Sequence, residues 1–163
     1  MEFPAGISTL QSITRTTMKK AFQTCVLLGL LLFQATGAFS QTKLDAETVA
    51  DLQKTPRYAF VLTEERHFKG VLEMYDLLVS NGVEISDYEI VVKGKVVTQL
   101  VRGSELETFF QKYRSKVRVS VCSVAMEILN VPQEALFEGL EVVPTASVRM
   151  LQLQARGYNT LTY

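Results

Sequence analysis

The side chain with the greatest chemical potential in this sequence is the thiol of Cys122. Residues 117–122 (VRVSVC) form an apolar-rich run typical of a buried strand, and a helix is predicted over residues 123–129. This order places the thiol at the carboxyl end of a strand and at the amino end of a helix. Ligands collect outside the carboxyl ends of strands in open α/β sheets, and the free N–H groups of a helix start favour a thiolate. The pattern therefore predicts a candidate reactive cysteine.

Two further residues could contribute to chemistry near the same predicted elements. His67 follows a predicted strand over residues 58–63, so its ring is expected at the same edge of the sheet as Cys122. Arg118 lies within the predicted strand 117–122, where a charged side chain needs a partner, a ligand or a subunit interface. We therefore name His67 as a candidate helper and Arg118 as a candidate anion stabiliser.

Each of these residues also has a structural interpretation. Most free cysteines are small buried hydrophobes, and Cys122 fits that description. In the alternation of the strand, Cys122 shares a face with Arg118 and Ser120, and this face is the more polar of the two. A polar face favours partial access of the thiol to solvent or a pocket. His67 can equally be a helix-start residue that hydrogen-bonds a nearby backbone group. Both interpretations stay open at this point.

Common cofactor and catalytic motifs are absent from the sequence. The turn after the first predicted strand reads TEERH over residues 63–67, so the G-x-G-x-x-G dinucleotide fingerprint fails there. There is also no P-loop and no G-x-S-x-G elbow. One histidine in the whole chain does not supply the ligands of a typical zinc site. We therefore expect no cofactor and no metal.

The amino-terminal region has the pattern of a secretory signal. Residues 18–20 are Met-Lys-Lys, residues 26–33 are the apolar run VLLGLLLF, and small residues precede the bond between Ser40 and Gln41. We predict an upstream start extension over residues 1–17, a signal peptide over residues 18–40 and cleavage near Ser40/Gln41. The apolar run is shorter than the roughly 20 residues of a membrane span. The expected location is therefore periplasmic or secreted, with no retained membrane span.

Removal of that signal defines the remaining chain, residues 41–163, which has the size of one domain. Without Glu2, Arg15, Lys19 and Lys20, it carries 14 basic and 16 acidic side chains and a net charge near −2. This charge argues against a nucleic-acid partner. The alternating basic residues 112, 114, 116 and 118 resemble a nucleic-acid patch, but they are interpreted as a solvated helix end and strand entry, with Arg118 as the exception discussed above. With Cys25 removed, Cys122 is the single thiol and has no disulfide partner within its own chain.

Strand and helix patterns alternate along residues 57–163, after an amino-terminal arm over residues 41–56. In the arm, residues 43–54 are predicted as a short helix or a loose segment. Strands are predicted at residues 58–63, 88–92, 117–122, 141–143 and 158–163. Helices are predicted at 68–79, 96–101, from 104 through a capping box formed by Ser104 and Glu107, at 123–129, after Pro132, and at 147–156 with Ser147 as its cap. The alternation predicts a three-layer α/β fold, with a mainly parallel five-stranded sheet and helices on both faces.

The segments VRVSVCSVAMEILNV and LFEGLEVVPTASVRMLQLQARGYNTLTY together resemble the carboxyl-terminal half of DsrE/DsrF-like proteins, which have the YchN-like fold. The first strand with His67 and the segment YEIVVKGKVVTQLV also resemble that family, so the likeness covers most of residues 57–163. It is closest to a secreted Gram-negative, Bacteroidetes-like branch. The resemblance implies a homotrimer or a homohexamer. It also implies that the position of Cys122 carries a persulfide and exchanges sulfur with donor and acceptor proteins.

Two functional hypotheses follow from different classes of protein. In the first, Cys122 is a persulfide-forming sulfur carrier or sulfurtransferase, assisted by His67 or Arg118 if either lies close enough. In the second, the chain is a non-catalytic oligomeric binding module of the cell envelope, and Cys122 is structural. Burial discriminates between them, because a thiol sealed among apolar side chains argues against the first hypothesis.

Overall fold

Five parallel strands form one sheet in the computed structural model, which describes residues 42–163. The predicted start extension and signal peptide, residues 1–17 and 18–40, lie outside the described residues. The strands are β1 (Arg57–Leu62), β2 (Asp87–Val92), β3 (Arg118–Cys122), β4 (Leu140–Val143) and β5 (Asn159–Thr162), in the spatial order β4-β3-β2-β1-β5. Every neighbouring pair is parallel. The predicted α/β class and the five-stranded sheet are confirmed.

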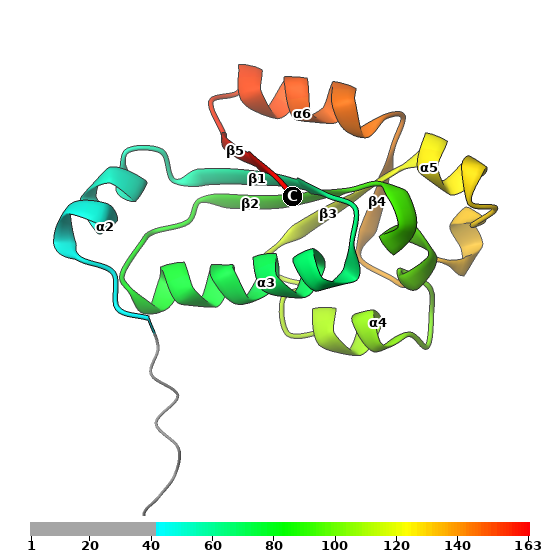
Figure 1. Cartoon of the computed structure of the whole chain (residues 1–163), viewed down its shortest axis with the longest axis horizontal. Coiled ribbons are helices and arrows are strands. Elements are labelled where there is room, and N and C mark those ends of the chain that lie inside the picture. The colour runs from blue at the N-terminus through cyan, green and yellow to red at the C-terminus, as the bar shows by residue number, and fades with distance from the viewer. Residues whose placement is uncertain (1–41) are drawn as a thin grey trace, which may run out of the picture. The chain divides into compact units, whose positions relative to one another are not determined.

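Helices cover both faces of this sheet (Figure 1). The chain steps outward from β1 to β4 through α3 (Glu65–Ser80), then η1 (Gly94–Gln99) with α4 (Glu105–Phe110), then α5 (Ser123–Ile128) with η2 (Gln133–Ala135). It then returns through α6 (Ala146–Ala155) to place β5 beyond β1. Because the return runs in the opposite direction, α6 lies on the face opposite to α3 and α4 (Figure 1).

The core lies on both sides of β1 and β2. Five consecutive residues of each strand are buried, YAFVL in β1 and YEIVV in β2, as expected for parallel strands covered on two faces. On the α3 side, aromatic and aliphatic side chains fill the space between sheet and helices. The largest of the fully buried side chains include Tyr88, Tyr113, Phe60, Phe68 and Phe110.

The amino-terminal arm is a docked helix. Of the two alternatives for residues 43–54, the structure shows the helix, α2 (Ala46–Gln53), which Asp45 caps by accepting a hydrogen bond from the N–H of Thr48 at 2.8 Å. The Tyr58 hydroxyl donates to the carbonyl of Leu52 at 2.7 Å. These contacts attach the arm to β1.

The capping contacts of two helices, α6 and α4, differ from the predictions. The cap of α6 is Thr145, whose Oγ1 accepts the N–H of Val148 at 3.1 Å, and Ser147 instead lies inside the first turn. Thr145 has extended dihedral angles, which an N-cap residue needs. At α4, Ser104 caps as predicted, but the Glu107 carboxylate accepts the N–H of Gly103 at 2.6 Å in place of the N–H of Ser104.

Candidate functional site

Cys122 ends β3 and starts α5, as the sequence predicts. It pairs in register with Val143 of the edge strand β4. The pairing of β3 with β2 ends one residue earlier, at Val121. The thiol therefore lies at the carboxyl edge of the sheet. The residue is 6% exposed.

A small hollow of about 260 Å³ opens at this position. Its lining combines the residues that follow β2 with one side of α5: Lys93, Gly94, Cys122, Val124, Ala125, Ile128 and Leu129. Ile128 is 73% exposed and Val124 is 43% exposed, so Cys122 lies deeper than the apolar rim. The thiol is thus nearly buried in an apolar hollow that remains open at its mouth.

The surroundings of the thiol differ from those expected from its phase in the strand. Arg118 and Ser120, the polar residues that alternate with the same phase as Cys122, both donate to the buried carboxylate of Glu89. Neither of them lines the hollow. The Cys122 side chain caps no N–H of α5, and α5 is only six residues long. Lys93 is the single charged residue of the lining.

Gly94 shapes the hollow and gives a stability prediction. Its φ of +69° lies in the left-handed region, and an added Cβ would lie 3.2 Å from the Cβ of Thr63. Gly82 has a φ of +83° but open space around it. We expect Gly82→Ala to lower the free energy of unfolding by roughly 1 kcal/mol through backbone strain, and Gly94→Ala by roughly 1 kcal/mol more through the added contact. Urea denaturation of both variants measures this difference, and equal losses would contradict it.

His67 lies at a different part of the same edge. It is in the first turn of α3, after β1, and its ring centroid is 5.3 Å from that of Tyr163. Its Nδ1 is buried and has no hydrogen-bond partner among the described residues. Strand β2 separates β1 from β3, so His67 is on the order of 10 Å from Cys122, and it does not line the hollow. The structure does not bring the candidate helper to the thiol.

Arg118 lies at the opposite end of β3 from Cys122. Four residue steps along the strand place their Cα atoms roughly 13 Å apart. The Arg118 guanidinium donates to the carboxylates of Asp87 and Glu89, both at 2.8 Å. The expectation that a charge in this strand needs a partner is confirmed, whereas the geometry gives no support to Arg118 as an anion stabiliser for Cys122.

Arg118 belongs to a partly buried ionic cluster with Asp87, Glu89 and Arg149. Glu89 is fully buried, and four donors surround its carboxylate. Oε1 accepts from Ser120 and from Arg149 Nε, both at 2.7 Å, and Oε2 accepts from Arg118 and Arg149 Nη2, both at 2.8 Å. Burial alone would raise the pKa of Glu89, but the hydrogen bonds from Arg149 and Ser120 and the two guanidinium charges hold it below its usual value.

The cluster extends to the surface through Tyr158. Its hydroxyl donates to Asp87, and the Arg57 guanidinium lies 5.5 Å from the centre of its ring. Burial and the hydrogen bond to Asp87 raise the pKa of Tyr158. Two carboxylates and two guanidinium groups balance in charge and bind one another, so we interpret the cluster as structural. A charged residue inside the apolar strand 88–92 is a sequence signal by which the buried role of Glu89 could have been found. No sequence pattern indicates that Arg149 is its partner.

Two of the basic residues that precede β3 are paired with acidic side chains. Lys112 contacts Asp76, and Arg114 donates to Glu138 at 2.8 Å. Within residues 42–163, no three His, Cys, Asp or Glu side chains gather in a way that could hold a metal ion. In the same part of the chain, no helix has the length and apolar character needed to cross a bilayer.

Comparison with solved structures shows the fold. The chain is similar to MTH1491 from Methanobacterium thermoautotrophicum, a protein of unknown function, with a TM-score of 0.57 and 21% identity over 66% of this chain and 98% of that one. It is also similar to BT1422 from Bacteroides thetaiotaomicron, a conserved protein of unknown function, with a TM-score of 0.50 and 17% identity over 65% of this chain and 94% of that one. No protein-family model and no curated protein matches the chain. At these identities the likeness establishes the α/β architecture, with both neighbours covered almost completely.

Proposed function

We propose that the protein is a DsrE-like persulfide carrier in which Cys122 accepts sulfur from a donor and passes it to an acceptor thiol. The observation that carries the proposal is the position of the thiol, at the carboxyl end of β3 and deep in an open apolar hollow. The parallel five-stranded sheet is consistent with the resemblance to DsrE/DsrF-like proteins found in the sequence. Membership of their secreted branch is part of this proposal.

The transfer requires no cofactor and no net oxidation. The Cys122 thiolate attacks the terminal sulfane sulfur of a persulfide or polysulfide, R–S–SH. The donor S–S bond breaks, a new S–S bond forms on Cys122, and R–S⁻ leaves with the electron pair. In the second half, an acceptor thiolate attacks the outer sulfur of the Cys122 persulfide and regenerates the Cys122 thiolate.

The hollow suits such an intermediate for two reasons. An almost buried persulfide on Cys122 is protected from dissolved reductants until an acceptor protein binds. The exposed side chains of Val124 and Ile128 form an apolar rim on which a donor or acceptor protein can dock. The ammonium of Lys93 favours anionic sulfur species at the mouth of the hollow.

Intact mass spectrometry after incubation with polysulfide tests the proposal. We expect the full chain with Cys25→Ser, which lacks the second thiol of the sequence, to gain sulfur that a reducing agent removes. We expect Cys122→Ser in the same Cys25→Ser background to abolish the gain. If Cys122→Ser, with an unchanged circular dichroism spectrum, keeps the full gain of sulfur, the carrier proposal is wrong.

The near-burial of Cys122 favours a second candidate, a non-catalytic oligomeric binding module with a structural cysteine. This candidate predicts a folded protein without any sulfur adduct on Cys122. For either function we propose a homotrimer or homohexamer, checked by light scattering of the purified chain. We also propose a periplasmic or secreted location after cleavage near Ser40/Gln41. Amino-terminal sequencing of protein from the envelope fraction tests this, and a start before Gln41 would contradict it.

A further inference from the structure

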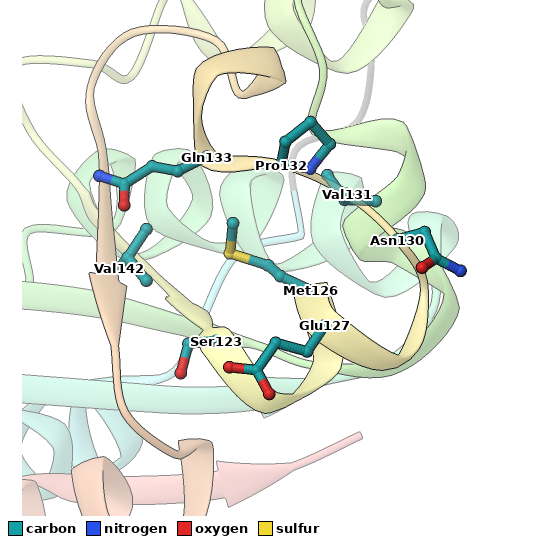
Figure 2. A pocket seen from close by; sticks show the side chains of 8 residues that line it. All are labelled: Ser123, Met126, Glu127, Asn130, Val131, Pro132, Gln133 and Val142. Carbon is teal, nitrogen blue, oxygen red and sulfur yellow. The ribbon is translucent and has the colours of Figure 1, made fainter.

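A second, larger hollow borders α5 (Figure 2). It shares no lining residue with the hollow at Cys122, and the proposed sulfur chemistry does not use it. Its volume is about 570 Å³, within the range of ligand-binding pockets. One wall is Val142 of β4, and the opposite wall is formed by Val131 and Pro132 (Figure 2). Figure 2 shows the Met126 side chain extending between these walls. The floor is therefore apolar.

The polar groups of this hollow sit on its rim. Figure 2 shows Gln133 on one side and Ser123 with Glu127 on the other. The Ser123 hydroxyl already donates to the carbonyl of Pro144 at 3.0 Å. Glu127 is exposed, and no ion pair or hydrogen bond of its carboxylate occurs within residues 42–163. It is also the single ionisable residue of the lining. The hollow therefore combines an apolar floor with one unpaired negative charge.

The wall formed by Val142 belongs to an edge strand. β4 pairs with β3 on one side alone, so the sheet ends at β4 in the described part of the chain. In a parallel pair, alternate residues direct their N–H and C=O groups away from the partner strand. Such outward groups can bind an added strand, while neighbouring pockets receive its side chains. The hollow lies beside this open edge.

We propose that this hollow and the outer edge of β4 bind an extended peptide segment with a lysine side chain. The peptide backbone pairs with β4 as an additional strand. Its lysine stem packs on Met126 and Val142, and the ammonium reaches the Glu127 carboxylate. The apolar floor selects the aliphatic stem, and the unpaired charge selects a cation over an anion. The open edge selects a peptide over a free amine, because an amine leaves the outward backbone groups of β4 unused.

Fluorescence polarisation with the full chain and labelled five-residue peptides tests the proposal. The probe is Thr-Val-Lys-Val-Thr with blocked ends, compared with Thr-Val-Glu-Val-Thr. A third peptide carries backbone N-methyl groups on alternate residues, and butylammonium serves as a competing free amine. We expect the lysine peptide to bind at least fivefold more tightly than the glutamate peptide. We also expect the N-methylated peptide to lose most of its affinity.

Glu127→Gln is the decisive variant, with Glu134→Gln as its matched control. Both side chains are exposed and lose one negative charge, but Glu134 does not line the hollow. An exposed ion pair contributes up to about 1 kcal/mol, so Glu127→Gln is expected to weaken binding of the lysine peptide about threefold to fivefold. Glu134→Gln is expected to leave it unchanged.

Three outcomes would overturn the proposal. The first is that the lysine peptide fails to bind at about millimolar concentration. The second is that Glu127→Gln and Glu134→Gln change its affinity equally. The third is that butylammonium displaces the labelled lysine peptide as effectively as the unlabelled peptide does. The last outcome would identify a free-amine site in place of a peptide groove. None of these results bears on Cys122, so the sulfur-carrier proposal stands or falls separately.

Discussion

Replacing Glu89 with glutamine is expected to lower the free energy of unfolding by about 3 kcal/mol or more. The fully buried carboxylate of Glu89 accepts from both Arg118 and Arg149. Glutamine removes the negative charge and places an NH₂ group against guanidinium donors, so Arg149 loses its carboxylate while its side chain remains only 14% exposed. Urea denaturation measures the loss.

Glu73→Gln is the matched control for this substitution. Glu73 is an exposed acid on α3, and its loss is expected to change the free energy of unfolding by less than about 0.5 kcal/mol. Removal of Arg149 in the Glu89→Gln background is expected to cost less than in the parent chain, because the two residues stabilise one another. Strictly additive effects would show that the pair does not interact.

The same carboxylate makes stability depend on pH. The pKa of Glu89 in the folded protein lies below its ordinary value of 4.5. The unfolded chain therefore binds the proton more readily, and the contribution of Glu89 is fully present above the unfolded pKa. It is lost as the pH falls through the folded pKa. We expect the parent chain to lose more stability than Glu89→Gln on acidification below that value, and equal slopes would contradict this role.

Truncating Tyr88 to alanine is expected to lower the free energy of unfolding by roughly 3–5 kcal/mol. The side chain is fully buried in β2, and its ring centroid lies 4.8 Å from that of Phe60 and 5.3 Å from that of Tyr75. Alanine would leave a cavity between the sheet and α3, because the rigid strand on one side and the helix on the other cannot collapse into it. Thermal and urea denaturation both report the loss.

Tyr88→Phe separates packing from hydrogen bonding at the same position. The Tyr88 hydroxyl donates to the carbonyl of Val71 at 2.7 Å inside the core. Phenylalanine keeps the ring and loses this bond, so a loss of about 1 kcal/mol is expected. If phenylalanine and alanine destabilise equally, the hydroxyl, and not the ring, is the main contribution of this residue.

The sequence predicts the framework well because its signals are local and repeated. A continuous apolar run marks β1, and an apolar run interrupted by Glu89 marks β2. Asn81 and Gly82 mark the end of α3, and strand–helix alternation implies parallel strands. The position of Cys122 at the junction of β3 and α5 follows from the same reasoning. These features depend on neighbours a few residues away, which a pattern can capture.

The surroundings of the candidate site could not be predicted in the same way. Whether His67 reaches Cys122 depends on the strand order, which places β2 between β1 and β3. Whether Arg118 reaches it depends on which face and which end of β3 its side chain occupies. The pairing of Glu89 with Arg149 joins residues 60 positions apart through the packing of α6 on the sheet. The apolar lining around Cys122 likewise brings together segments that follow two different strands. Such contacts are set by tertiary packing, and neither periodicity nor composition encodes them.

The pairing of β5 with β1 has a consequence for the order of folding. Tyr58 pairs with Asn159, about a hundred residues later in the chain. No two strands here are joined by a hairpin, because all are parallel, and the β1–β5 contact closes the longest loop of the sheet. We expect β5 to dock last, through a slow step governed by the entropy of loop closure. Until it docks, the apolar strand β1 has an open edge, and the folding intermediate is most exposed to aggregation at that edge.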